Sequence, residues 1–282
     1  MPGSTPPFPN PPLVLTVLEI RYTEIADGLG DSERVGLKNA LNEYLPLMES
    51  QIEEQFAVAV GASAPASVQS RLYPRFGTRD RTTALLVKQD ALVLETTAYA
   101  GWEEHFRPLV SEVVVALEQV SRPDGVLRVG LRYIDEIRVP GIELAPGDWR
   151  GYIDKHLLAG AAPEFIPEHM RPSVWQGVAQ YQTTAGSTLA VRYGPQEGYA
   201  VDPQSLTRRK NPPRSGLFFL LDSDSYWLGD EEVPEFNADW ILERCDLLHA
   251  PAREFFKIAV TDKLRNEVFS QLEGGGQWEK PT

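Results

Sequence analysis

The amino-acid sequence predicts an α+β fold: an internally duplicated unit of strand, helix, antiparallel strands and long helix forms one curved antiparallel sheet with the helices on one face. Three observations support this prediction. The stretches LEIRYTEI and GLRYIDEI, at 18–25 and 130–137, alternate in polarity and share an Arg-Tyr pair. The same order of expected elements follows each stretch. Each half then ends in a long helix with one apolar face.

The duplication divides the chain into four segments. They are an unfolded Pro-rich lead-in at 1–12, a first repeat at 13–125, a second repeat at 126–272 and a flexible tail at 273–282. An α+β domain without duplication is the alternative, because the identity between the two halves is weak.

The first repeat opens with a half-buried strand at 13–24, in which apolar residues occupy one parity and polar residues mostly the other. A helix is expected over 32–45, and after Pro46 the helical pattern resumes over 47–56. Strands are then expected at 71–80, 82–88 and 91–99. The clearest helix of the chain, at 106–120, closes the repeat because its apolar residues recur every three or four positions.

The second repeat follows the same order. A strand is expected at 126–139, and a shorter helical segment at 148–158. Further strands are expected at 173–184, 187–194 and 216–228. Asn237 caps a long helical stretch at 238–269, in which Pro251 predicts a kink or a break.

The composition limits the classes of function. The chain has 282 residues, 42% of them hydrophobic, and a net charge of −13. This balance fits a globular protein and argues against general binding of nucleic acid. No apolar run reaches the roughly 18–20 residues of a membrane helix, and the N-terminus shows no secretory signal. The single cysteine, Cys245, fits a reducing compartment, so a cytoplasmic protein is expected.

Four stretches resemble a sporadically distributed bacterial family of uncharacterised proteins of similar length. They are PPLVLTVLEIRY at 11–22, LRVGLRYIDEI at 127–137, FFLLDSDSY at 218–226 and LLHAPAREFFKIAVTDKLR at 247–265. The family has no established activity, and its patchy distribution implies accessory genes such as defence or toxin–antitoxin modules. The order of elements is also similar to the duplicated saddles of TATA-binding-type and helix-grip folds, an analogy of fold alone.

Arginines on the strand face opposite the helices form the first candidate site. Arg21 lies on the first strand, and Arg128, Arg132 and Arg138 lie on the matching strand of the second repeat. Their guanidinium groups can receive an anionic ligand or an acidic segment of a partner. Ordinary cross-strand ion pairs are the alternative. The carboxylates available for such pairs are Glu19, Glu95 and Glu136.

A loop with clustered positive charge is the second candidate. It reads YAVDPQSLTRRKNPPRSG and carries Arg208, Arg209, Lys210 and Arg214 in a chain otherwise short of cations. The loop is too long and Pro-rich for a simple hairpin turn, and such loops often carry binding function. It is expected to contact phosphates or an acidic partner, and a mobile, solvated loop is the alternative.

Asp222 and Asp224 are the candidate metal ligands. They lie two residues apart on an expected strand, so both carboxylates point to the same side. Paired carboxylate oxygens can hold Mg²⁺. The sequence places no third acidic ligand beside them, and a solvated strand end is the alternative.

Other reactive side chains have plainer interpretations. Cys245 and His249 share a helix face, but Cys245 continues an apolar stripe and is expected to be a packed core thiol. Asp135 interrupts an apolar strand face, and Glu24 lies near the matching place in the first repeat. Each is expected where its strand leaves the core. The remaining histidines show no metal-ligand spacing, and the chain has no P-loop, HExxH or G-x-S-x-G motif.

These observations favour a non-catalytic binding protein over an enzyme. It would recognise a protein partner or an anionic ligand through the open sheet face and the basic loop, without a cofactor. The family resemblance implies an antitoxin-like or phage-defence role. The alternative is a metal-dependent hydrolase or nuclease that uses Asp222 and Asp224 with Mg²⁺.

Overall fold

A computed structural model describes residues 8–25, 29–57, 67–142, 149–161, 166–167, 169–170, 175–229 and 232–271. The expected tail at 273–282 and residues 1–7 of the expected lead-in lie outside these ranges. Residues 8–12 lie against the C-terminal part of the chain. Phe8 packs on Phe269 with ring centroids 5.2 Å apart, and the Asn10 N–H donates to the Phe269 carbonyl at 3.0 Å.

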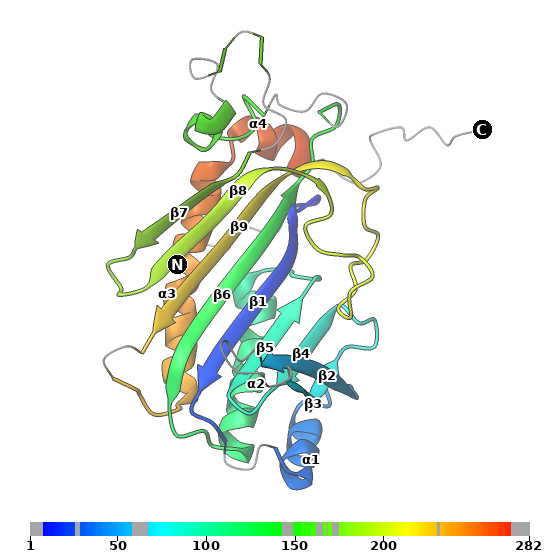
Figure 1. Ribbon diagram of the computed structural model, residues 1–282, viewed down its shortest axis with the longest axis vertical. Coiled ribbons are helices and arrows are strands. Elements are labelled where there is room, and N and C mark those ends of the chain that lie inside the picture. Colours follow the sequence, from blue (N-terminus) through cyan, green and yellow to red (C-terminus); the bar gives the residue numbers. More distant parts are fainter. Residues whose placement is uncertain are drawn as a thin grey trace, which may run out of the picture.

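The described residues form one antiparallel sheet of nine strands, in the order β2-β3-β4-β5-β1-β6-β9-β8-β7 (Figure 1). The strands are β1 Leu13–Tyr22, β2 Leu47–Ala57, β3 Ser67–Gly77, β4 Thr83–Val87, β5 Ala91–Thr96, β6 Val126–Ile137, β7 Gly177–Gln182, β8 Thr188–Gly198 and β9 Gly216–Leu228. The predicted α+β class with a single antiparallel sheet is confirmed.

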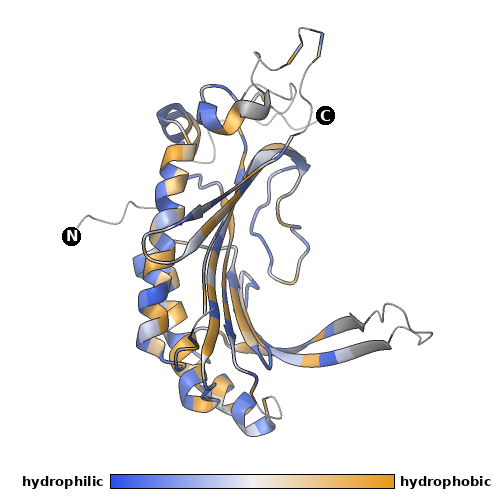
Figure 2. Cartoon of the chain, turned by 60° about the vertical axis from the view of Figure 1, so that its left-hand side comes forward, coloured by the Kyte–Doolittle hydropathy of each residue, from blue (hydrophilic) through white to orange (hydrophobic). Residues whose placement is uncertain are grey.

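The helices lie on one face of this sheet, also as predicted (Figures 1 and 2). They are α1 Asp31–Ala40, the π-helix η1 Trp102–Phe106, α2 Arg107–Val120, the 3-10 helix η2 Lys155–Ala161, α3 Ala238–Ala259, α4 Asp262–Leu264 and the π-helix η4 Arg265–Phe269. Helices α2 and α3 pack on each other, and α3 contacts the central strands β6 and β9. The opposite face of the sheet is concave (Figure 2).

Strands β1 and β6 pair at the centre of the sheet, with Leu18 opposite Leu131. Strand β5, which precedes α2, flanks β1, and strand β9, which precedes α3, flanks β6. The strand before each long helix therefore pairs with the first strand of its own half. That this shared order reflects an internal duplication stays a prediction.

The main core lies between the sheet and the helices. Leu18 of β1 and Leu131 of β6 are fully buried there, together with Phe106 of η1 and Val110 of α2. A smaller cluster lies on the concave face, beneath the loop between β8 and β9. It consists of Val14, Ile134, Phe218 and Leu220, with Ala200 and Val201 of the loop packed against it.

The expected helical continuation over 47–56 is wrong. Strand β2 occupies this region and pairs with β3 along eleven residues, from Leu47 opposite Gly77 to Ala57 opposite Ser67. The pairing partner lies beyond the hairpin, so the strand is set by tertiary hydrogen bonds that outweigh the local helical pattern. The β2–β3 hairpin, residues 47–57 and 67–77, is called the arm below.

Pro251 does not break α3, which continues through it as one helix. Proline removes the N–H that would bond the carbonyl of Leu247, but Leu247 is exposed, so water can hydrate that carbonyl. The expected long helical stretch divides instead at Val260, whose backbone is extended with φ −108° and ψ 139°. Asn237 caps α3 as predicted, since its side chain accepts the Trp240 N–H at 2.9 Å.

Candidate functional site

The predicted sheet arginines lie on the concave face. Arg21 of β1 and Arg128 of β6 are directly opposite each other, and Arg132 lies opposite Val17. Leu18, at the alternate parity of β1, is buried beneath the helices. Alternation along the strands therefore directs the arginines away from the helices.

Glu19 binds two of these arginines. Arg21 Nε donates to Glu19 Oε1 at 2.5 Å, and Arg128 Nη1 donates to Glu19 Oε2 at 2.8 Å. Arg128 Nη2 also donates to Asp224 Oδ2 at 3.1 Å. The hydrogen bond and charge of Glu19 raise the pKa of Arg21. Burial raises the pKa of Asp224, although the nearby arginines oppose this shift.

Asp222 is held by Arg132 in a bidentate ion pair. Arg132 Nε and Nη2 donate to Oδ1 and Oδ2 of Asp222, both at 2.7 Å. Arg192 Nη2 on β8 lies 3.4 Å from Asp222 Oδ2. The Asp222 side chain is only 6% exposed, so this is a largely desolvated, charge-assisted contact. Its hydrogen bond raises the pKa of Arg132.

The two candidate metal ligands are therefore already occupied by arginines. Asp222 and Asp224 do point to the same face, as their spacing predicts, but a Mg²⁺ ion would have to displace Arg132 and find further oxygen ligands. Within the described ranges, no group of three or more His, Cys, Asp and Glu side chains is placed to hold a metal ion. Here the two aspartates form part of an ion-pair network.

The basic loop between β8 and β9 passes over the concave face (Figures 1 and 2). Two of its predicted binding residues fasten it to the sheet. Arg209 Nη1 donates to Glu136 Oε1 at 2.8 Å, and Lys210 Nζ lies 2.6 Å from Asp80 Oδ2. The Lys210 contact is the largest cause of the lowered pKa of Asp80. These cations hold the loop in place.

The other predicted cations divide into fixed and exposed groups. Arg138 Nε donates to Glu136 Oε1 at 2.9 Å. Glu95 accepts from the loop residue Thr207 and lies 3.8 Å from Arg75 Nη2 of β3. Arg208 and Arg214 are exposed, and their side chains make no hydrogen bond or ion pair with any residue that the structure describes. The binding role of the whole set stays a prediction.

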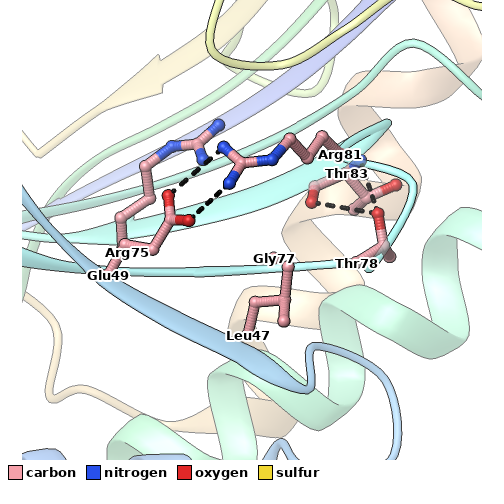
Figure 3. Close-up of a pocket in the computed structure, with 7 residues that line it drawn as sticks. All are labelled: Leu47, Glu49, Arg75, Gly77, Thr78, Arg81 and Thr83. Carbon is pink, nitrogen blue, oxygen red and sulfur yellow. Dashed lines mark hydrogen bonds and ion pairs between the residues drawn. The ribbon is translucent and has the colours of Figure 1, made fainter.

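A small recess lies at the base of the arm, between β2, β3 and β4 (Figure 3). Its volume is about 10 Å³, which is room for one water molecule. Arg81 lies beside it and donates through Nη2 to Glu49 Oε1 at 2.7 Å. The recess is too small for an organic ligand.

A much larger cavity lies on the helix side of the sheet, where the sequence predicted no site. Its volume is about 580 Å³, enough for a drug-sized organic molecule. The segment before β1, the segment that enters η1, the central strands β6 and β9, and the second half of α3 all contribute to its walls. Its polar and aromatic lining includes Tyr99, Trp102, Tyr133, Asp135, Ser223 and His249.

Aromatic side chains form much of this lining. Trp102 stacks on His249 with ring centroids 4.8 Å apart, and Tyr99 meets Tyr133 edge-on at 5.9 Å. The Tyr133 hydroxyl and His249 Nδ1 are hydrogen bonded at 2.8 Å. Burial lowers the pKa of His249 to about 4, so its imidazole is neutral at pH 7.

Asp246 holds the η1 wall of the cavity against α3. Trp102 Nε1 donates to Asp246 Oδ1 at 2.9 Å, and Arg107 donates to both carboxylate oxygens at 2.8 Å. Gly101, immediately before η1, has a φ of +118°, a value that favours glycine. Single π-helical turns often accompany functional sites. These contacts fix the position of Trp102 in the cavity wall.

Asp135 is the buried carboxyl group of the cavity. It is 5% exposed and lines the cavity from β6, and it makes no hydrogen bond or ion pair with the described residues. Burial, reinforced by the charge of Asp222, raises the pKa of Asp135 to about 8, so the carboxyl is mostly protonated at pH 7. The expectation that Asp135 lies where its strand leaves the core is wrong. Glu24 does lie beyond the end of β1 and is exposed.

The sequence does not predict the cavity, because its walls come from segments far apart in the chain. Asp135 was the available signal, as an acid on an apolar strand face. The sequence relates His249 only to Cys245, which shares its helix face. Cys245 is fully buried, and burial raises the pKa of its thiol to about 12, which confirms a packed core thiol.

Comparisons with known proteins give no match, whether with family models, with curated proteins or with solved structures. The resemblance to a sporadically distributed bacterial family therefore stays a prediction. In the parts of the chain that the structure describes, no helix is both long and apolar enough to span a bilayer.

Proposed function

We propose that this chain is a non-catalytic binding protein that recognises a protein partner through the arm, the concave face and the basic loop. The observation that carries the proposal is the arm, which extends beyond the body of the sheet (Figure 2). Strand β3 pairs with β4 only over residues 75–77, whereas it pairs with β2 along its whole length. The outer arm is therefore a two-stranded ribbon, which is marginally stable in water without a third layer.

Exposed aliphatic side chains lie on one face of the arm. Ile52 and Leu72 are directly opposite each other and are 63% and 58% exposed. Met48 lies on the same face and is 45% exposed. Met48 is opposite Phe76, which is buried in the main core, so this face of the arm continues the helix side of the sheet, and a partner that also contacts the basic loop must wrap around the β2 edge. Clustered exposed aliphatic residues on a projecting ribbon are typical of a protein interaction surface. A partner that covers them would bury apolar area and support the ribbon.

The charges of the concave face favour a protein partner over a free anion. Arg128 and Arg132 are neutralised by carboxylates of neighbouring strands, so the centre of the face offers little unpaired positive charge. The exposed cations of this face and its loop include Arg21, Arg192 and Lys210, which are ion-paired. Arg208 and Arg214 are exposed and make no ion pair with the described residues. Spaced guanidinium groups of this kind suit acidic side chains on a folded surface or peptide, where they contribute orientation and specificity. An antitoxin-like or defence-associated protein would use such a surface.

Affinity enrichment from the cells that express the protein, followed by calorimetry with the purified partner, tests the proposal. Two variants remove the surface: Ile52→Asp with Leu72→Asp on the arm, and Arg208→Glu with Arg214→Glu on the loop. Val178→Asp is the matched control, because Val178 is 73% exposed on β7 at the opposite edge of the sheet. We expect one partner that binds the wild type and the control with equal affinity and loses affinity for both surface variants.

Equal affinity for all four proteins would contradict the proposal. A homodimer that dissociates on Ile52→Asp, measured by light scattering, would also contradict it, because the arm would then bind a second copy of the chain. Arg209 is left unchanged in these variants, since its ion pair with Glu136 holds the loop in place.

A further inference from the structure

We propose that the helix-side cavity binds a small organic amine, whose ammonium group pairs with Asp135. The site goes beyond the partner surface proposed above, and it is separate from that surface because none of its lining residues belongs to the arm or to the basic loop. The inference rests on the cavity, on a buried carboxyl within it that makes no hydrogen bond or ion pair with the described residues, and on the aromatic side chains around that carboxyl.

Asp135 differs from the other buried acids of the described residues, which are Glu136 and Asp222. Glu136 Oε1 accepts from Arg138 at 2.9 Å and from Arg209 at 2.8 Å. Asp222 accepts from Arg132 through both oxygens. Burying a carboxylate without a partner is costly, and this fold supplies a guanidinium group to those two. At Asp135 there is a cavity instead, so a cation can be supplied from outside.

The walls of the cavity suit an organic cation. The rings of Tyr99, Trp102 and Tyr133 line it together with Phe256 of α3. Aromatic faces attract ammonium groups and also contact the apolar body of a ligand. His249 carries no positive charge at pH 7, because burial lowers its pKa to about 4. A volume of about 580 Å³ accommodates a one- or two-ring amine.

The charges at the rim do not exclude a cation. The carboxylates of Glu103 and Glu104 are exposed there, and the cations are Arg253, Lys257 and Arg265. Arg265 is paired with Asp262, so two exposed carboxylates face the two remaining cations. A protonated Asp135 could instead donate a hydrogen bond to a ligand oxygen. However, Ser223 already provides a hydroxyl donor in the same cavity. Donating a hydrogen bond therefore does not require a buried carboxyl group, whereas pairing with an ammonium group does.

Isothermal titration calorimetry on the full chain tests the site, with tryptamine and 2-phenylethylamine as probes. The matched non-cationic probes are 2-phenylethanol and 3-phenylpropionate. Asp135→Asn keeps the size and a donor but removes the charge, and Glu104→Gln is the control for loss of a carboxylate at the rim. We expect the amines to bind the wild type and Glu104→Gln alike, and Asp135→Asn to weaken binding on the order of a hundred-fold.

A second readout follows the proton. The ammonium group favours ionised Asp135, so at pH 7 binding releases the carboxyl proton to the buffer. The measured heat should then change with the ionisation enthalpy of the buffer at pH 7, and much less at pH 9, where Asp135 is already ionised. Thermal unfolding of Asp135→Asn confirms that the variant is folded.

Three results would overturn the proposal. They are absence of binding by both amines up to about 10 mM, equal affinity of the amines for wild type and Asp135→Asn, and binding of 2-phenylethanol or 3-phenylpropionate as tight as that of the amines. The last result would assign Asp135 a donor role toward oxygen. None of these outcomes bears on the arm or the basic loop, so the partner proposal is tested separately.

Discussion

The buried carboxyl groups on the two faces of the sheet differ in their hydrogen-bond partners. On the concave face, Asp222 is bound by Arg132 through two hydrogen bonds of 2.7 Å. On the helix face, Asp135 makes no such contact with the described residues. The two positions are close in the sheet, since Asp135 lies opposite Leu221, the neighbour of Asp222. Among the described residues, the buried carboxylates of the concave face are therefore paired with arginines, whereas Asp135 in the helix-side cavity is not.

Asp135→Asn should give the largest effect, and its sign follows from the raised pKa. The folded protein keeps Asp135 protonated up to about pH 8, whereas the unfolded chain ionises it near its ordinary value of 3.8. The stability that this group contributes at low pH is thus lost as the pH rises from 4 to 8. The advantage of Asp135→Asn over wild type should grow from near zero at pH 4 to about 5 kcal/mol at pH 8.

Urea denaturation of both proteins at pH 4, 6 and 8 measures this difference in the free energy of unfolding. A constant difference across that range would show that Asp135 is not the group that titrates. Glu104→Gln, which removes an exposed carboxylate, should show no trend with pH.

Arg132→Met should give the next largest effect, with the opposite sign. The substitution keeps much of the side-chain volume but leaves Asp222 buried with only the longer contact to Arg192 at 3.4 Å. We expect the free energy of unfolding at pH 7 to fall by about 3 kcal/mol, because removing one partner of a buried pair exposes the cost of burying the other. Arg21→Met is the control: Arg21 is 60% exposed, and its loss should cost less than about 1 kcal/mol. Equal losses for the two variants would contradict the distinction.

Asp246→Asn should give a smaller effect, at the edge of the cavity. Burial opposes ionisation of Asp246, but hydrogen bonds from Arg107 and Trp102 prevail and lower its pKa. Its contribution to stability is therefore present above the ordinary pKa and is lost as the pH falls through the lowered value. Because the side chain is partly solvated, we expect Asp246→Asn to cost about 1 kcal/mol at pH 7. The cost should disappear at acidic pH in the same urea experiment.

The smallest effect is expected from magnesium. Since Arg132 occupies both oxygens of Asp222, titration of Mg²⁺ or Mn²⁺ should give no binding heat with the wild type or with Asp224→Ala. A signal with the wild type alone would instead support the metal-dependent hydrolase.

More of the fold than of the candidate site could be predicted from the sequence. Alternation along 13–24 and 126–139 was sufficient to place the arginines on the face away from the helices, because side-chain direction in a strand is a local property. The same local reasoning failed at 47–56, where pairing with β3 decides the structure. It also misplaced the break in the last helix, which depends on Val260 leaving the helical conformation and not on Pro251.

The pairing of charges and the cavity are tertiary properties, so local patterns could not reveal them. Arg132 meets Asp222 across 90 positions of sequence, and Tyr133 meets His249 across 116. The sequence showed Asp135 as an acid on an apolar face, but it could not show whether a guanidinium group or a cavity lay opposite.

Carboxyl-detected NMR of Asp135 tests the central claim most directly. We predict one aspartate resonance that titrates near pH 8, is lost in Asp135→Asn and moves to lower pH when tryptamine is added. An Asp135 that titrates near the ordinary value of 3.8, or whose titration is unaffected by saturating amine, would contradict the claim that this carboxyl group binds a cationic ligand.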